Sequence, residues 1–280
     1  MPLVVPLVSA LVVPLATSLL GIHPDTSAWM FRVTANGGTV SMADAAAMDQ
    51  AASVFRSVGL ADTNTRLNAF VGNQLAAALV PYWRGPSGPN VDVNTNFISG
   101  DYTRATGITG NGTKKSLLVN IPQNSWTASN RHIAAYERTR PATIFASLMG
   151  SDNAPANLNA IALGTRDTGN KDEFDCSAFF SGPSEPVNAL PLGLLVGSQT
   201  VSTTGNIYRN GALVLSAAVS AATPGTEPMR IFALSRAGSP TGWTTASQGG
   251  YAMGVGLTGA QVATYSAAWT ALMTAFGRNV

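Results

Sequence analysis

Hydrophobic and polar positions follow different periods on the two sides of a Pro/Gly-rich stretch near residue 85. Before it, between Ser41 and Gly59, apolar residues recur every three or four positions: Ala45, Met48, Ala52, Phe55 and Val58. This spacing predicts a helix with one buried face, which Ser41 would begin as N-cap and Gly59 would end. Residues 66–80 predict a second helix that Pro81 stops, and residues 29–33 a short apolar strand.

After residue 95 the pattern changes to short apolar runs separated by turn residues. The runs that predict strands are 142–149, 158–165, 174–180, 193–201, 229–235 and 251–255. Asn210-Gly211 stands between two further apolar runs and predicts a type I′ hairpin. Regular short strands with turn signals indicate a mainly β fold, an antiparallel jelly-roll-type β-sandwich.

The last apolar pattern predicts a C-terminal amphipathic helix. Thr258 and Gln261 form a capping box at its start. An apolar stripe follows at helical spacing: Val262, Tyr265, Trp269, Leu272 and Phe276. We expect this stripe to pack on the sandwich rather than on a partner.

These patterns divide the chain into four expected parts. Residues 1–28 form an apolar N-terminal docking arm, 29–84 a small helical unit, 85–95 a Pro/Gly linker and 96–280 the β-sandwich. The linker is the densest run of turn residues. A long loop within one compact body is the alternative.

The first 22 residues contain no charged side chain. A signal peptide would have a basic start, which is missing here. A transmembrane helix would be interrupted by Pro2, Pro6 and Pro14, so no membrane partner is expected. We interpret residues 1–22 as an arm that docks on other subunits of an assembly, with packing on its own body as the alternative.

The amino-acid composition favours a chain that is part of a larger assembly. Only 11% of the 280 residues are charged, against about 25% in an ordinary soluble domain, so much of the surface is expected to meet other protein, in a homo-oligomer or a larger particle. The net charge is +2 and no basic run occurs, which argues against nucleic-acid binding. The single cysteine, Cys176, cannot form an internal disulfide and is expected to be buried.

Four stretches resemble bacteriophage virion proteins that carry a concanavalin A-like (laminin G-like) lectin/glucanase sandwich. They are residues 96–102, 107–114, 207–211 and 256–261. The resemblance implies a location in the virion, as tail fibre, tail tip or capsid decoration. It also implies a host surface glycan as a ligand.

The sequence contains few candidate catalytic or metal-binding residues. Neither His23 nor His132 lies in a catalytic motif, and no metal or cofactor is expected. Glu173 and Asp175 would share one face of a strand, as in glucanases of this kind, but Ser177 and Ala178 leave the third acid missing. The acidic group Asp167, Asp172, Glu173 and Asp175 is expected to be a solvated loop, with a calcium site as the alternative.

Trp126 and Trp243 are the candidate ligand-binding residues, because aromatic faces suit the apolar faces of sugars. Tyr251 is expected in the core. The leading hypothesis is therefore a structural component of a phage virion and not an enzyme. Host-glycan recognition is the alternative, and a polysaccharide hydrolase is third.

Overall fold

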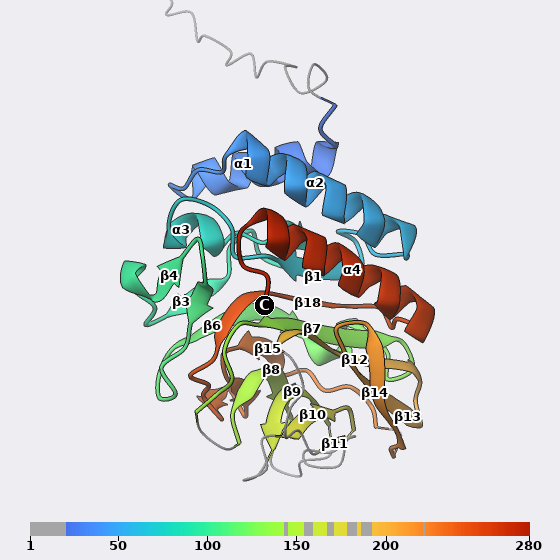
Figure 1. Ribbon diagram of the computed structural model, residues 1–280. Helices are drawn as coiled ribbons and strands as arrows, with labels where there is room; N and C mark the ends of the chain where they lie inside the picture. Colours follow the sequence, from blue (N-terminus) through green and yellow to red (C-terminus); the bar gives the residue numbers. More distant parts are fainter. Residues whose placement is uncertain are drawn as a thin grey trace, which may run out of the picture.

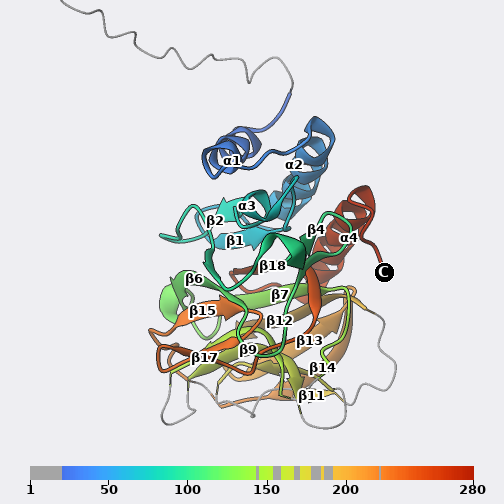
Figure 2. The same cartoon turned by 90° about the vertical axis from the view of Figure 1, so that its left-hand side faces the viewer.

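The computed structural model describes residues 21–142, 145–153, 159–166, 171–177, 184–185, 192–220 and 222–280. It has three layers: a helical layer, sheet A and sheet B (Figure 1 and Figure 2). The helices cover the outer face of sheet A, and the two sheets face each other across a hydrophobic core. The predicted fold, a mainly β sandwich with a C-terminal helix, is confirmed.

Sheet A is antiparallel throughout. Its strands, in spatial order, are β14 (Ala212–Ala218), β13 (Thr204–Arg209), β12 (Gly193–Val201), β7 (Arg131–Glu137), β18 (Ser247–Gly254), β1 (Thr65–Asn68) and β2 (Trp83–Arg84). Two short strands extend it beside β18: β5 (Gly107–Thr109) and β4 (Tyr102–Thr103).

Sheet B, as far as its strands are described, contains one parallel pair. Its main path is β11 (Ser184–Glu185), β10 (Lys171–Asp175), β9 (Ala160–Arg166), β8 (Ser147–Asp152), β15 (Pro228–Ile231), β6 (Ser116–Pro122) and β3 (Val93–Thr95). The strand β16 (Leu234–Arg236) runs parallel to β8 and pairs on its other side with β17 (Ser239–Thr241).

The central strand β7 shows how alternation along a strand builds the layers. Ile133 and Ala135 point into the core between the sheets, whereas Ala134 and Tyr136 point into the core beneath the helices. Successive side chains of a strand lie on opposite faces, so a strand that is apolar on both faces must be covered on both. This explains why β7 is buried along its whole length.

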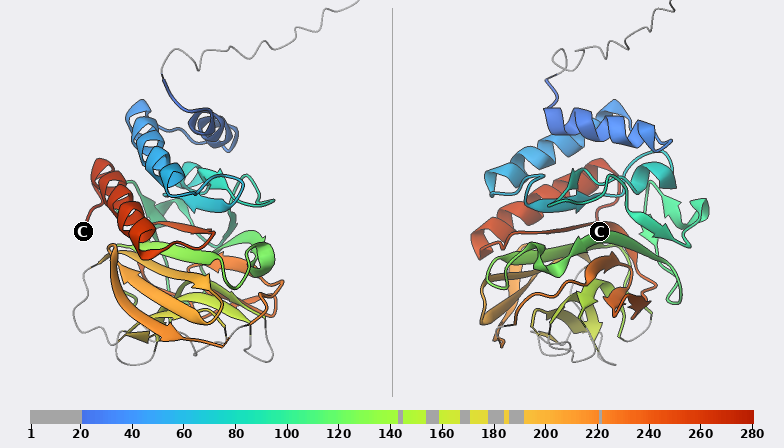
Figure 3. Two further views of the ribbon diagram at one scale, coloured as in Figure 1. Left: turned by 90° about the vertical axis from the view of Figure 1, so that its right-hand side faces the viewer. Right: turned by 180° about the vertical axis from the view of Figure 1, so that it is seen from behind.

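Three long helices form the layer over sheet A: α1 (Pro24–Ala35), α2 (Met42–Ser57) and α4 (Gly259–Ala275) (Figure 3). The predicted caps are confirmed, with Ser41 Oγ accepting from Asp44 N and the Thr258–Gln261 capping box closing the start of α4. The rings of Phe55 and Trp269, both from predicted apolar stripes, lie 5.9 Å apart between α2 and α4. Among the described residues, the remaining helical turns are α3 (Leu75–Ala78) and the 3₁₀ turns at Ser99–Asp101 and Gln123–Ser125.

The hairpin between β13 and β14 is confirmed. Asn210 and Gly211 have φ of 51° and 89°, the left-handed values that a type I′ turn requires at both central positions.

Two local predictions were wrong. Residues 29–33 lie in α1 rather than in a strand, because His23 caps the helix and Pro24 fixes its first turn. Residues 66–80 are not one helix: β1 pairs with β18, and only one helical turn, α3, follows. Tertiary pairing outweighs the weak helix propensity of this segment.

The segment expected as a linker, residues 85–95, is packed into the fold. Asp92 is buried and receives hydrogen bonds from Arg66 Nη2 (2.6 Å), Asn68 Nδ2 (2.8 Å) and Tyr251 Oη (2.7 Å). Residues 93–95 then form β3 of sheet B. Residues 29–84, expected as a separate unit, contribute β1 and β2 to sheet A, so the two parts share one sheet.

Most of the predicted arm, residues 1–20, lies outside the described residues. Within the part of the chain that the structure describes, no helix has the length and hydropathy to cross a membrane.

Candidate functional site

One end of the sandwich holds a cavity of about 510 Å³ that includes a predicted ligand-binding residue. Three connections meet there: the turn after β6, the turn between β12 and β13, and the segment that leads to β15. We call this cavity the Trp126 pocket; its lining residues are Asn124, Trp126, Thr127, Ala128, Ser202, Ala222, Thr223 and Pro224. This volume lies within the range that is typical of small-molecule sites, about 300–1,000 Å³.

Trp126 is held rigidly in this pocket. Its indole Nε1 donates to Asn64 O (2.8 Å), and only 7% of the residue is exposed. The buried part of the ring belongs to the core between the sheets. The indole therefore offers the pocket a fixed apolar edge whose position does not depend on a ligand.

The remaining lining groups are small and neutral. Asn124 and Thr127 are exposed at the rim, and Ser202 is half-buried. Their amide and hydroxyl groups can both donate and accept hydrogen bonds. No charged side chain is among the described residues that line the pocket. The pocket can therefore hold a neutral polar molecule with one apolar face.

Trp243 lies at the opposite end of β6. It is half-buried, and the neighbouring Thr244 O accepts from Gly112 N (3.0 Å), just before β6 begins, whereas Trp126 follows the end of that strand. Seven strand residues span about 23 Å, so the structure does not bring the two tryptophans together. Tyr251, expected in the core, is fully buried there.

Part of the predicted acidic loop is instead a buried ion-pair cluster between the sheets. Arg209 donates to both carboxylate oxygens of Asp172, from Nε to Oδ2 (3.0 Å) and from Nη2 to Oδ1 (2.7 Å) and Oδ2 (2.6 Å), and its Nη1 lies 3.0 Å from Glu137 Oε2. Arg140 adds a contact of 2.6 Å to Asp172. Burial raises the pKa of Glu137, and the charge of Arg209 opposes that rise.

This ion-pair cluster includes Asp172, one of the acidic residues considered as a calcium site. Asp172 is committed to two guanidinium groups, and Asp167 lies outside the described residues. No group of three or more His, Cys, Asp or Glu side chains that could hold a metal occurs among the residues described.

Glu173 and Asp175 lie on the other face of β10. Because Phe174 between them points into the core between the sheets, both side chains lie on the opposite face of sheet B, where Glu173 is 5% and Asp175 2% exposed. Their partners across the strand pair are Gly164 and Ala162, whose side chains are small. Ser177, at the position of the missing third acid, follows the end of the strand.

The cysteine and the two histidines lie in surroundings that indicate structural roles. Cys176 is buried, as expected, and burial raises its thiol pKa to about 12. His132 is buried beneath α4, and burial lowers its pKa to about 4. His23 is the N-cap of α1.

No family model and no curated protein matches the chain. Among solved structures, it is similar to the sialidase of Trypanosoma rangeli in complex with sialic acid (13% identity, 75% of this chain and 33% of that chain, TM-score 0.49). It is also similar to the NanB sialidase of Streptococcus pneumoniae (18% identity, 56% and 26%, TM-score 0.43). A third is domain 4 of AbnA, a GH43 arabinanase of Geobacillus stearothermophilus, in complex with arabinotriose (14% identity, 65% and 83%, TM-score 0.41).

This chain spans about a quarter to a third of the two sialidase chains. At such identities the likeness concerns the fold alone. The proteins found are glycoside hydrolases rather than phage structural proteins, so the expectations of a virion structural role and of no enzymatic activity are withdrawn. The resemblance to phage proteins, a location in the virion and docking of residues 1–22 on other subunits stay predictions.

Sequence reasoning identified Trp126 but none of its neighbours in the pocket. Ser202 and Thr223 belong to connections about 75 and 100 positions further along the chain. Serine and threonine are common in turns, so nothing in their local sequence distinguishes them.

Proposed function

We propose that the chain is a carbohydrate-binding β-sandwich protein that holds a neutral sugar unit in the Trp126 pocket. The observation that carries the proposal is the pocket itself: a fixed indole edge beside exposed amide and hydroxyl groups, in a cavity of about 510 Å³.

The two kinds of surface in the pocket match the two kinds of surface on a sugar. A pyranose presents C–H groups on its faces, which suit an aromatic ring, and hydroxyl groups around its edge, which need hydrogen-bond partners. Asn124, Thr127 and Ser202 supply such partners from two different turns. Because no arginine or lysine is among the described residues that line the pocket, these residues offer a sugar carboxylate no cation to pair with, and a neutral sugar is favoured.

The test is binding of the full chain to an array of neutral and sialylated oligosaccharides, followed by calorimetric titration with the best neutral one. Replacing both rim hydroxyls, in Thr127→Ala/Ser202→Ala, should weaken binding by about tenfold or more, since each hydrogen bond contributes about 0.5–1.5 kcal/mol. Both side chains lie at the surface, so the fold should be retained.

A matched control carries the same pair of changes near Trp243. Ser239→Ala/Thr241→Ala alters two exposed residues of β17 and should leave affinity unchanged. Loss of binding in this control alone, binding restricted to sialylated glycans, or no binding to the array would each overturn the proposal.

Glycoside hydrolysis is a second candidate, favoured by Glu173 and Asp175. The two acids lie two residues apart on one strand and so share one face, as a glycosidase carboxylate pair requires, with 5% of Glu173 and 2% of Asp175 exposed. Release of nitrophenol from neutral nitrophenyl glycosides, reduced about 100-fold or more in Glu173→Gln, would support it. Release no faster than in buffer would exclude it for those substrates.

A further inference from the structure

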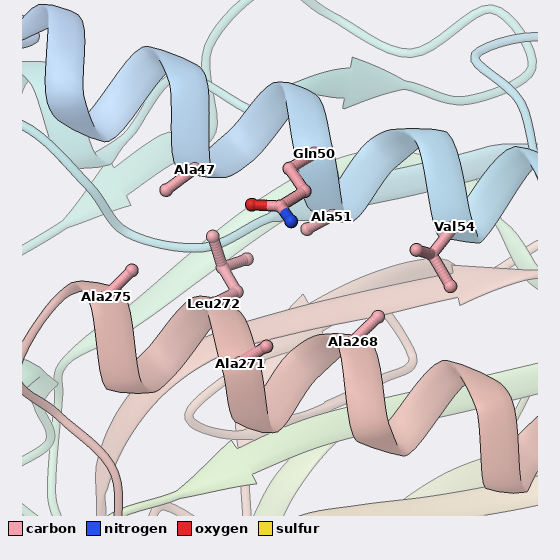
Figure 4. Close-up of a pocket in the computed structure, with 8 residues that line it drawn as sticks. All are labelled: Ala47, Gln50, Ala51, Val54, Ala268, Ala271, Leu272 and Ala275. Carbon is pink, nitrogen blue, oxygen red and sulfur yellow. The ribbon is translucent and has the colours of Figure 1, made fainter.

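A second, apolar groove runs between α2 and α4 on the outside of the helical layer. Figure 4 shows side chains of the two helices facing each other across it, with Leu272 rising from α4 and Gln50 opposite. Seven of its eight lining residues are apolar and five are alanines: Ala47, Gln50, Ala51, Val54, Ala268, Ala271, Leu272 and Ala275. The hollow measures about 100 Å³.

The surroundings of this α2/α4 groove carry no charge toward it. The helix α4 has no charged residue between Gly259 and Ala275. The three charged residues of α2 are engaged elsewhere: Asp44 with Arg104 (2.5 Å), Asp49 with Thr26 (2.5 Å) and Arg56 with Asp25 (3.2 Å). Among the described lining residues, the groove is thus apolar, with the Gln50 amide as its one polar side chain.

The chain itself contains a segment of matching chemistry. None of residues 1–20 is charged. Their large side chains include a leucine at every fourth position, namely Leu3, Leu7, Leu11, Leu15 and Leu19. Alanines leave room on a helix surface that leucine and valine side chains can fill.

This segment joins the fold beside the groove. The backbone N–H of His23 donates to Asp49 Oδ1 (3.2 Å), and Asp49 is the neighbour of Gln50 in α2. The groove residues of α2, 47 to 54, span about 10 Å at 1.5 Å per residue. Twenty residues can extend to about 66 Å, so the segment can easily cross α2 and follow the groove.

We propose that the apolar segment 1–20 docks in the α2/α4 groove of its own chain. Attachment at His23 gives the segment an effective concentration in the millimolar range, which favours this occupant over a second copy. The prolines at positions 2, 6 and 14 lack an N–H group, which reduces the number of backbone donors that docking would leave unpaired. The Gln50 amide can pair with the backbone of the docked segment.

The test is digestion of the full chain by proteinase K, with cleavage within residues 1–20 followed by mass spectrometry. Cleavage tracks the undocked population when docking is fast. In Ala271→Lys, an exposed lysine enters the groove and cleavage should accelerate by at least about tenfold, equivalent to about 1.4 kcal/mol of docking free energy. Ala263→Lys is the matched control, because Ala263 is exposed on α4 but does not line the groove.

Digestion at two protein concentrations 100-fold apart separates the occupants. If the segment docks on its own chain, the cleavage rate is the same at both protein concentrations. Slower cleavage at the higher concentration would show a second copy in the groove and overturn the proposal. Equal cleavage of the unmodified chain and Ala271→Lys, with both variants folded by circular dichroism, would also overturn it.

Discussion

His132 provides a quantitative test of how closely α4 seals the outer face of sheet A. The imidazole is fully buried on β7, its ring centroid is 5.7 Å from that of Tyr265 on α4, and Nδ1 lies 2.6 Å from Val255 O. This contact requires the proton on Nδ1, which donates to the carbonyl. Nε2 has no hydrogen-bond partner among the described residues, so protonation there would place an unpaired charge in the core.

The magnitude follows from the pKa of His132, which burial lowers from 6.5 to about 4. Below pH 6.5 the unfolded chain binds a proton that the folded chain excludes, so the free energy of unfolding falls as the pH falls. The loss reaches about 2.5 kcal/mol at pH 4.5 and approaches its full value of about 3.4 kcal/mol well below pH 4, at 1.36 kcal/mol per pKa unit.

The variant His132→Asn removes the titrating group and keeps an N–H donor near the position of Nδ1. It should be less stable than the unmodified chain at pH 7, because it leaves a small cavity. Its deficit should shrink by about 2.5 kcal/mol at pH 4.5, since the variant loses no proton-linked stability. Carboxylates that titrate in the same range are shared by both proteins and cancel in the comparison.

Urea unfolding at pH 7 and pH 4.5, followed by circular dichroism, measures both free energies. An equal deficit of His132→Asn at both pH values would refute the reasoning and show that water reaches His132 beneath α4.

Three further predictions concern buried groups and one turn. Arg209→Met leaves Asp172 and Glu137 buried without their main cation and should lower the free energy of unfolding by about 3–5 kcal/mol in urea titration; a loss below about 1 kcal/mol would contradict the buried cluster. Cys176 is 1% exposed, and burial raises its thiol pKa to about 12. It should therefore not react with iodoacetamide at pH 8 until urea unfolds the chain. Rapid labelling of the native protein would contradict its burial. Gly211→Ala places a side chain at a φ of 89°, with its Cβ 3.2 Å from Ser266 Cβ, and should lower the thermal midpoint by several degrees, equivalent to about 1–2 kcal/mol; an unchanged midpoint would contradict the hairpin geometry.

Elements marked by local chemistry could be predicted from the sequence. The start of α4 follows from Thr258 and Gln261, and that of α2 from Ser41, because a cap involves residues three positions apart. The hairpin at Asn210 follows from the φ values that its two-residue turn demands.

Elements set by distant partners could not be predicted. The strand β1 forms because its residues pair with β18, almost 190 positions later: Thr65 lies opposite Gly254. Its neighbour Arg66 is buried because Asp92 and Tyr251 meet it there. No local signal in residues 85–95 shows that this turn-rich stretch is fixed by a buried ion pair.

The same distinction applies to the site. Trp126 could be proposed from its residue type, but its side-chain neighbours come from turns whose positions the sandwich topology sets. Trp243, in a similarly turn-rich context, lies at the other end of β6.

The most direct test of the proposed function follows the five tryptophan indole N–H signals by NMR during titration with the best neutral oligosaccharide from the array. Three indoles belong to residues buried in the core beneath the helices: Trp29, Trp83 and Trp269. The remaining two are Trp126 and Trp243, and Trp126→Phe assigns the signal of the former. A shift confined to Trp126 is the predicted result. A shift at Trp243 instead, or no shift at saturating sugar, would contradict carbohydrate binding in the Trp126 pocket.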